Sequence, residues 1–87
     1  MATVWIPSPL RPLVEGQSQV IVSGRTVGKV IDALESAYPG LKSRLLCDNQ
    51  INPLIQVLVD NRTALLGLAE PVGEKSEVLF LPTISGG

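Results

Sequence analysis

The chain offers few side chains for catalysis or metal binding. Histidine, the commonest general base and a frequent metal ligand, is absent from the 87 residues. A single cysteine among scattered carboxylates gives neither a disulfide nor the ligand spacing of a metal site. The glycines do not form the phosphate-binding patterns GxGxxG or GxxxxGKS/T. These absences predict a protein that is not an enzyme and that binds no metal or cofactor of its own.

The end of the chain carries the one group that another protein could activate. Pro82 closes an apolar run, and residues 83–87 have no further element to join, so we expect them to form a mobile arm. Gly86 and Gly87 lack a Cβ and can pass, with Ser85 before them, through a narrow cleft. The α-carboxylate of Gly87 would then be the reactive group. Simple fraying of a chain end is the alternative, because two glycines alone are a weak motif.

The single thiol has a structural and a chemical interpretation. Leu45, Leu46 and Ile51 surround Cys47 in the sequence and predict a buried, inert side chain. A sulfur-handling role is the lesser alternative, because only Arg44 is close enough in sequence to lower the pKa of the thiol.

Composition places the chain among small packed domains. Hydrophobic residues make up 45% and charged residues 17%, which predicts one globular core. Seven basic and eight acidic residues leave a net charge of −1 without a charged run, so we expect no nucleic-acid partner. No apolar stretch approaches the roughly 20 residues that span a bilayer, and the first residues do not resemble a secretion signal. The expected location is the cytoplasm.

The order of elements predicts an α+β roll. Strands at residues 3–6 and 17–23 would form an antiparallel hairpin. The stretch 26–38 has apolar residues at helical spacing, with Thr26 as N-cap and Pro39-Gly40 as its stop, while Asp32, Glu35 and Lys42 are expected on the solvated surface.

The second half predicts the rest of the sheet. One or two helical turns near residues 41–46 and a polar loop at 47–54 precede strands at 55–60 and 77–82, with a short weak strand in 64–72. A mixed four- to five-stranded sheet would then pack on one main helix, with the last strand parallel to the first. We expect one domain, residues 1–82, followed by the tail, residues 83–87.

Strand parity separates a core face from an outer face of this sheet. Alternate side chains point to opposite sides, so one set packs on the helix. That inward set is Val4, Ile6, Val57, Val59, Val78 and Phe80. The outer face then carries four large apolar side chains, and so much exposed apolar surface suggests a docking site, with Leu81 as its best candidate beside the tail. These residues are Trp5, Leu58, Leu79 and Leu81. Coverage by loops or by the proline-rich segment 7–12 is the alternative.

Several stretches together resemble one known superfamily. They are TVGKVIDALESAYPGLKSRL for a helix and its exit, IQVLVDNR for a middle strand and turn, GEKSEVLFLPTISGG for the ending, and LRPLVEG after the first strand. In this order they are similar to the ubiquitin-like sulfur-carrier proteins of the MoaD and ThiS superfamily, which share the β-grasp fold.

The resemblance implies a mechanism in which the carrier supplies no catalytic side chain. A ubiquitin-activating-type adenylyltransferase, like MoeB or ThiF, would use ATP to adenylate the carboxylate of Gly87. A sulfur donor would then displace AMP and leave a thiocarboxylate for a sulfur-accepting synthase. The family also docks partners through an apolar surface beside the tail, and the matching positions are Leu81 and Phe80.

The recipient pathway stays open in the sequence. The segment LLCDNQINPLIQ is similar in placement to one in carriers that serve cysteine synthesis, and the small subunit of molybdopterin synthase is the close alternative. A protein modifier that forms isopeptide bonds and a plain β-grasp interaction module are two further hypotheses.

Overall fold

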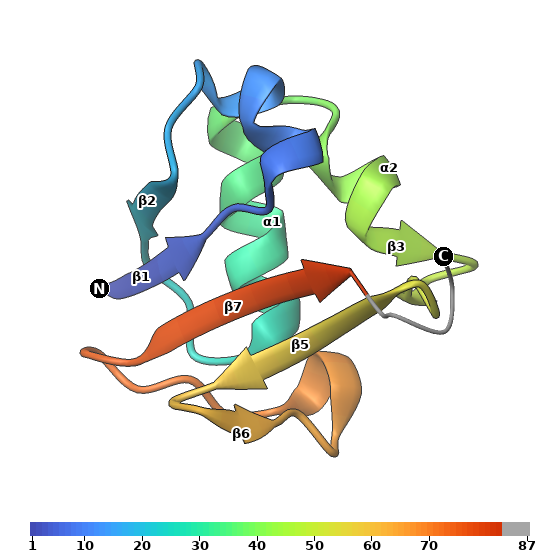
Figure 1. Cartoon of the computed structure of the whole chain (residues 1–87). Coiled ribbons are helices and arrows are strands. Elements are labelled where there is room, and N and C mark those ends of the chain that lie inside the picture. The colour runs from blue at the N-terminus through green and yellow to red at the C-terminus, as the bar shows by residue number, and fades with distance from the viewer. Residues whose placement is uncertain (83–87) are drawn as a thin grey trace.

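The computed structural model describes residues 1–82 and shows a mixed sheet curved around one main helix (Figure 1). The sheet has five strands in the order β2-β1-β7-β5-β6. The elements of the sheet and its helix are β1 (Ala2–Trp5), β2 (Gln19–Val22), α1 (Val27–Ala37), β5 (Ile55–Val59), β6 (Arg62–Thr63) and β7 (Glu77–Pro82). No helix in residues 1–82 is long and apolar enough to cross a membrane.

The remaining elements join these strands. A 3₁₀ helix, η1, lies between β1 and β2, and a short helix, α2, leads into a small hairpin before β5. A second 3₁₀ turn, η2, precedes the last strand. Their bounds are η1 (Ser8–Val14), α2 (Leu41–Leu45), β3 (Leu46–Cys47), β4 (Gln50–Ile51) and η2 (Gly67–Ala69).

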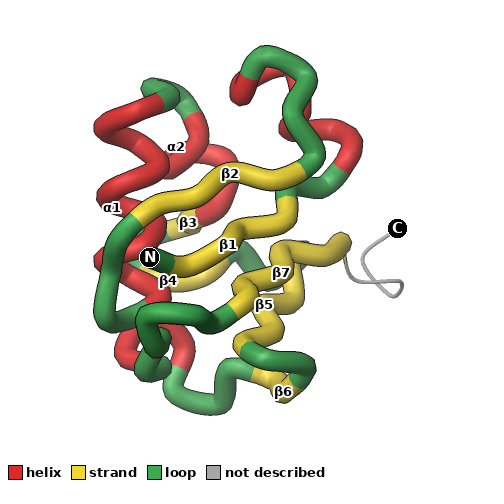
Figure 2. The backbone as a smooth tube through the Cα atoms, turned by 90° about the vertical axis from the view of Figure 1, so that its left-hand side faces the viewer, coloured by secondary structure: helices red, strands yellow, loops and turns green. Residues whose placement is uncertain are grey.

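The strand pairing confirms the predicted roll. β1 is antiparallel to β2 and parallel to β7, and β7 is antiparallel to β5. The last strand therefore lies beside the first, and α1 lies in the crossover between them, as Figure 2 shows from the side. β7 is the central strand and runs directly into the residues that follow Pro82.

The main helix forms where its periodicity predicts. The Thr26 hydroxyl accepts a hydrogen bond from the Lys29 backbone N–H at 3.2 Å and so caps the first turn. One face of α1 is fully buried against the sheet by Val27, Val30, Ile31 and Leu34. The sheet meets it with the inward set that strand parity predicts, and all six members of that set are buried.

The prolines after β1 end that strand as predicted, and a 3₁₀ helix follows. Two other local predictions are wrong. The expected polar loop at 47–54 contains the β3–β4 hairpin, whose turn residues Asp48 and Asn49 have φ of 54° and 63°. Asp and Asn tolerate this left-handed conformation better than other side chains, which makes a two-residue turn feasible there. The predicted short strand in residues 64–72 is also misplaced. The short strand is β6, which directly follows a turn where Asp60 and Asn61 have positive φ, and η2 lies in the stretch where the strand was expected.

Candidate functional site

The outer face of the sheet carries an apolar row that crosses three strands. The register places Trp5 beside Leu79, and Leu79 beside Leu58, all pointing away from α1. Gln19 on β2 and Thr63 on β6 extend the same row with polar side chains at either edge. Leu81 lies two residues beyond Leu79 on the central strand, so it shares the outer face and is the member nearest to residues 83–87. We call Trp5, Leu58, Leu79 and Leu81 the outer apolar face.

The structure confirms the predicted placement of all four residues. Trp5 and Leu81 are each 38% exposed, and Leu79 and Leu58 are half-buried. The indole N–H of Trp5 donates a hydrogen bond to Glu77 Oε1 at 3.0 Å, which anchors the ring across β1 and β7. The role of this face in docking a partner stays a prediction at this point.

Phe80 requires a correction. The resemblance to the sulfur carriers assigns it to the docking surface, but its side chain is only 1% exposed. β7 alternates its side chains, so Phe80 points into the core between Leu79 and Leu81. It can support the outer apolar face from beneath, but it presents almost no surface to a partner.

The proline-rich segment borders the outer apolar face and leaves it partly open. A shallow hollow of about 400 Å³ lies between Trp5, Leu79 and Leu81 on one side and residues 7–11 on the other. Arg11 lines this hollow, and its Nε–H donates to the Ile6 carbonyl at 3.1 Å. The alternative of full coverage is therefore wrong. The segment adds a wall with one positive charge.

A polar network fixes the start of the central strand. The Asp60 carboxylate accepts hydrogen bonds from the Glu77 backbone N–H at 2.9 Å and from the Ser76 hydroxyl at 2.7 Å. The backbone hydrogen bond is the largest of the effects that hold the pKa of Asp60 below its usual value, followed by the Ser76 hydrogen bond and the nearby charge of Arg62. Ser76 Oγ in turn accepts from the Gly73 N–H at 2.8 Å. This network ties the turn before β7 to the end of β5.

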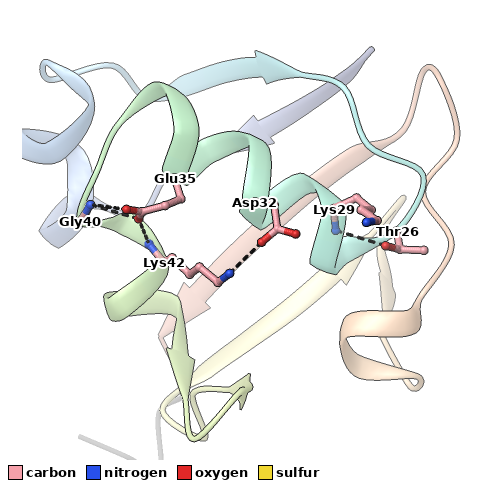
Figure 3. A network of polar contacts seen from close by, with 6 residues as sticks. All are labelled: Thr26, Lys29, Asp32, Glu35, Gly40 and Lys42. Carbon is pink, nitrogen blue, oxygen red and sulfur yellow. Dashed lines mark hydrogen bonds and ion pairs between the residues drawn. The ribbon is translucent and has the colours of Figure 1, made fainter.

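Another polar network joins α1 to α2 and has a structural role (Figure 3). The Glu35 carboxylate accepts from the backbone N–H groups of Gly40 and Lys42 at 3.1 and 2.9 Å, which satisfies the first free donors of α2. Lys42 Nζ contacts Asp32 Oδ1 at 2.9 Å. This hydrogen bond lowers the pKa of Asp32 and raises the pKa of Lys42. Asp32 and Lys42 are exposed, as predicted, and Glu35 is half-buried. All three also interact with one another or with the backbone.

The thiol and the carboxylates form no reactive cluster in the part of the chain that the structure describes. Cys47 is exposed, which overturns the prediction of a buried thiol. It is followed by the β3–β4 turn, where Leu46 takes the more buried position of the pair. Within residues 1–82 no three His, Cys, Asp or Glu side chains gather as they would to hold a metal ion. The predicted tail residues Ser85, Gly86 and Gly87 lie outside the described residues.

These features define a class of protein. One helix on a five-stranded mixed sheet, with the first and last strands parallel in its centre, is the β-grasp fold of ubiquitin-like proteins. The chain belongs to the ThiS family, whose model matches residues 4–87.

Individual relatives agree with this assignment. Sulfur carrier protein CysO of Mycobacterium tuberculosis (strain ATCC 25618 / H37Rv) is 34% identical over 90 residues, covering 98% of this chain and 97% of the relative. A chain in the crystal structure of the Amycolatopsis orientalis BexX/CysO complex superposes with a TM-score of 0.93 at 32% identity and full coverage of both chains. Small archaeal modifier protein 1 of Haloferax volcanii is 40% identical over 63 residues, covering 71% of this chain and 70% of the relative.

Proposed function

We propose that the chain is a sulfur carrier whose Gly87 carboxylate is adenylated by a ubiquitin-activating-type enzyme and converted to a thiocarboxylate. The observation that carries this proposal is the position of Leu81. An exposed apolar side chain at the end of the central strand stands one residue before Pro82 and beside a hollow where a partner can bind. The family match runs through Gly87, and a full-length relative is a sulfur carrier protein.

The chemistry requires no side chain of this protein. A carboxylate oxygen of Gly87 attacks the α-phosphorus of ATP, pyrophosphate leaves, and an acyl-adenylate forms. A sulfur nucleophile then attacks the acyl carbon and AMP leaves with the oxygen that joined it to the carbonyl. With sulfide as the nucleophile, the product is the thiocarboxylate. ATP and its metal ion would belong to the activating enzyme, which fits the scarcity of catalytic groups in the sequence.

The outer apolar face would give the activating enzyme a fixed grip beside the reacting end. Burial of one large apolar side chain is worth about 1.5–3 kcal/mol, so several partly exposed ones supply a useful share of a docking energy. Arg11 adds a positive charge at the rim, which would favour an acidic side chain on the partner. The same face would serve the synthase that accepts the sulfur.

Cysteine biosynthesis in the cytoplasm is the recipient pathway that we favour, since a relative matched over 97% of its own length is CysO, a sulfur carrier protein. The small subunit of molybdopterin synthase is the alternative within the same chemistry. Protein modification is a second candidate function, because the chain is also similar to a small archaeal modifier protein. In that function an amine of the target, and not sulfide, would attack the adenylate.

Intact mass measurement tests the proposal. After incubation with a cognate activating enzyme, ATP and sulfide, the mass of the carrier should rise by about 16 Da, the difference between sulfur and oxygen. A matched chain without Gly87 should stay unchanged and should melt at the same temperature. Sulfur uptake by the truncated chain, or none by the full chain, would refute the assignment. Covalent conjugates of higher mass in cell extract would support the modifier instead.

A further inference from the structure

One edge of the sheet is open. β2 is the last strand on its side of the sheet, and among residues 1–82 no strand other than β1 pairs with it. Its side chains alternate between Val20 and Val22, which are buried, and Ile21, which is 62% exposed on the outer face. Ile21 pairs with Thr3, two residues before Trp5 on β1, so it lies on the same face of the sheet as Trp5.

The backbone of β2 has hydrogen-bonding groups that point away from the sheet. Ile6 N–H donates to the Ser18 carbonyl, so these directly opposed residues form a hydrogen-bonded pair between β1 and the start of β2. Hydrogen-bonded and non-hydrogen-bonded pairs alternate along an antiparallel ladder. Gln19 and Ile21, at one and three residues from Ser18, therefore direct their N–H and C=O groups outward. No backbone hydrogen bond outside the sheet uses these groups within residues 1–82.

The two edges of the sheet differ in their protection. Edge strands usually avoid pairing with other chains by being short or by carrying a charge or a proline. β6 is only two residues long and includes Arg62. The stretch 17–23, QSQVIVS, has no charged residue, no proline and no glycine, and it is rich in strand-forming side chains. Of the two edges of the described five-stranded sheet, the β2 edge is thus the one fit to accept another strand.

We propose that a second copy of this chain pairs antiparallel with β2 about a two-fold axis at Ile21. In that register Ile21 faces its own copy, Val20 faces Val22, and Gln19 faces Ser23, so apolar side chains meet apolar ones and polar ones meet polar ones. The hydrogen-bonding groups of Gln19 and Ile21 then find partners, and the two exposed isoleucine side chains cover each other.

The charges that flank β2 favour this occupant over an unrelated strand. Glu15 precedes the strand and Arg25 follows it, and both side chains are exposed. Antiparallel pairing of two copies brings the Glu15 end of one strand to the Arg25 end of the other, twice, so opposite charges approach at both ends of the interface. A single strand pair buries less area than interfaces of standard size, so the dimer should be weak and dependent on concentration.

The interface lies two strands away from β7, which leaves Leu81 accessible in the dimer. The proposal therefore does not depend on the sulfur-carrier function. Its experiment measures only association, and failure of either proposal leaves the other standing.

Sedimentation equilibrium of the full chain with a thiol reductant tests the pairing, since the reductant excludes a disulfide through Cys47. We expect a reversible monomer–dimer equilibrium with a dissociation constant below about 1 mM. Ile21→Lys places two positive charges opposite each other and should weaken the dimer at least about tenfold, equal to about 1.4 kcal/mol. Leu66→Lys is the matched control, because Leu66 is 64% exposed and lies in the turn at η2.

Amide hydrogen exchange provides a second readout. The N–H groups of Gln19 and Ile21 should exchange more slowly at high protein concentration, because they become hydrogen-bonded in the dimer. A monomer at every concentration would overturn the proposal. So would a dimer that survives Ile21→Lys, or exchange at Gln19 and Ile21 that does not respond to concentration in a dimeric sample.

Discussion

Replacement of Leu81 by aspartate separates the docking role of this side chain from its contribution to folding. Leu81 is 38% exposed, so about three-fifths of its surface is already covered in the free protein. Full burial of leucine is worth about 1.5–3 kcal/mol, which assigns about 1–2 kcal/mol to folding and about 0.6–1.2 kcal/mol to docking. Leu81→Asp removes both contributions.

A carboxylate at an apolar interface adds a further penalty to docking. Desolvation of an unpaired polar group costs at least about 2 kcal/mol, so the total loss in docking free energy is about 3 kcal/mol or more. This corresponds to a more than about hundredfold weaker interaction with the activating enzyme. The folding loss of about 1–2 kcal/mol should lower the Tm by about 5–15 °C in a domain of this size.

The assay is ATP–pyrophosphate exchange at increasing carrier concentration, with the Tm measured on the same samples. Leu66→Asp is the control, because its side chain is 64% exposed and is not part of the outer apolar face. It should lower the Tm by less than Leu81→Asp and leave the KM for the carrier unchanged. A folded Leu81→Asp variant with the wild-type KM would refute the docking face. An equal rise in KM for Leu66→Asp would assign docking to another surface.

Three further predictions concern the scaffold. Gly24→Ala would place a Cβ 2.7 Å from the Val30 backbone nitrogen, so we expect the free energy of unfolding, measured in urea, to fall by about 1–3 kcal/mol. An unchanged urea midpoint would contradict this close approach. Because the native pKa of Asp60 is lowered from 3.8, the stabilisation by its carboxylate is complete above pH 3.8 and is lost as the pH falls through the native pKa. The Tm difference between wild type and Asp60→Asn should therefore vanish in acid. A Tm difference that does not depend on pH would show that it does not come from the ionised carboxylate. Cys47 should react with a thiol reagent in the native protein about as fast as in urea, and strong protection would argue against its exposure.

The fold could be predicted because its signals are local and periodic. The helix at 27–37 has a cap and one apolar face, and the strands alternate cleanly enough that parity alone places Phe80 inward and Leu81 outward. Parity from the sequence was in fact the better guide for Phe80 than family resemblance, which assigned it to the docking surface. The reason is physical, since two successive residues of a strand cannot share a face.

The misplaced features depend on contacts that a linear pattern does not contain. Cys47 has apolar neighbours in sequence, but the β3–β4 hairpin turns Leu46 toward the core and leaves the thiol outside. The Asp60 network joins residues 16 and 17 positions apart, which the pairing of β5 with β7 brings together. Neither feature has a period or a motif that would indicate it before folding.

The arrangement of β7 explains why so inert a scaffold suits a carrier. The strand is paired on both sides and is fixed at its start by Asp60, so the outer apolar face and the exit at Pro82 hold a constant relation to each other. In the proposed function, a partner that binds Leu81 would thus hold the end of β7 at a defined place. Orientation of this kind can replace a large part of a reaction barrier without any catalytic side chain on the carrier. Under this account, substitutions on the outer apolar face should change KM, whereas substitutions in the α1–α2 network should change only stability.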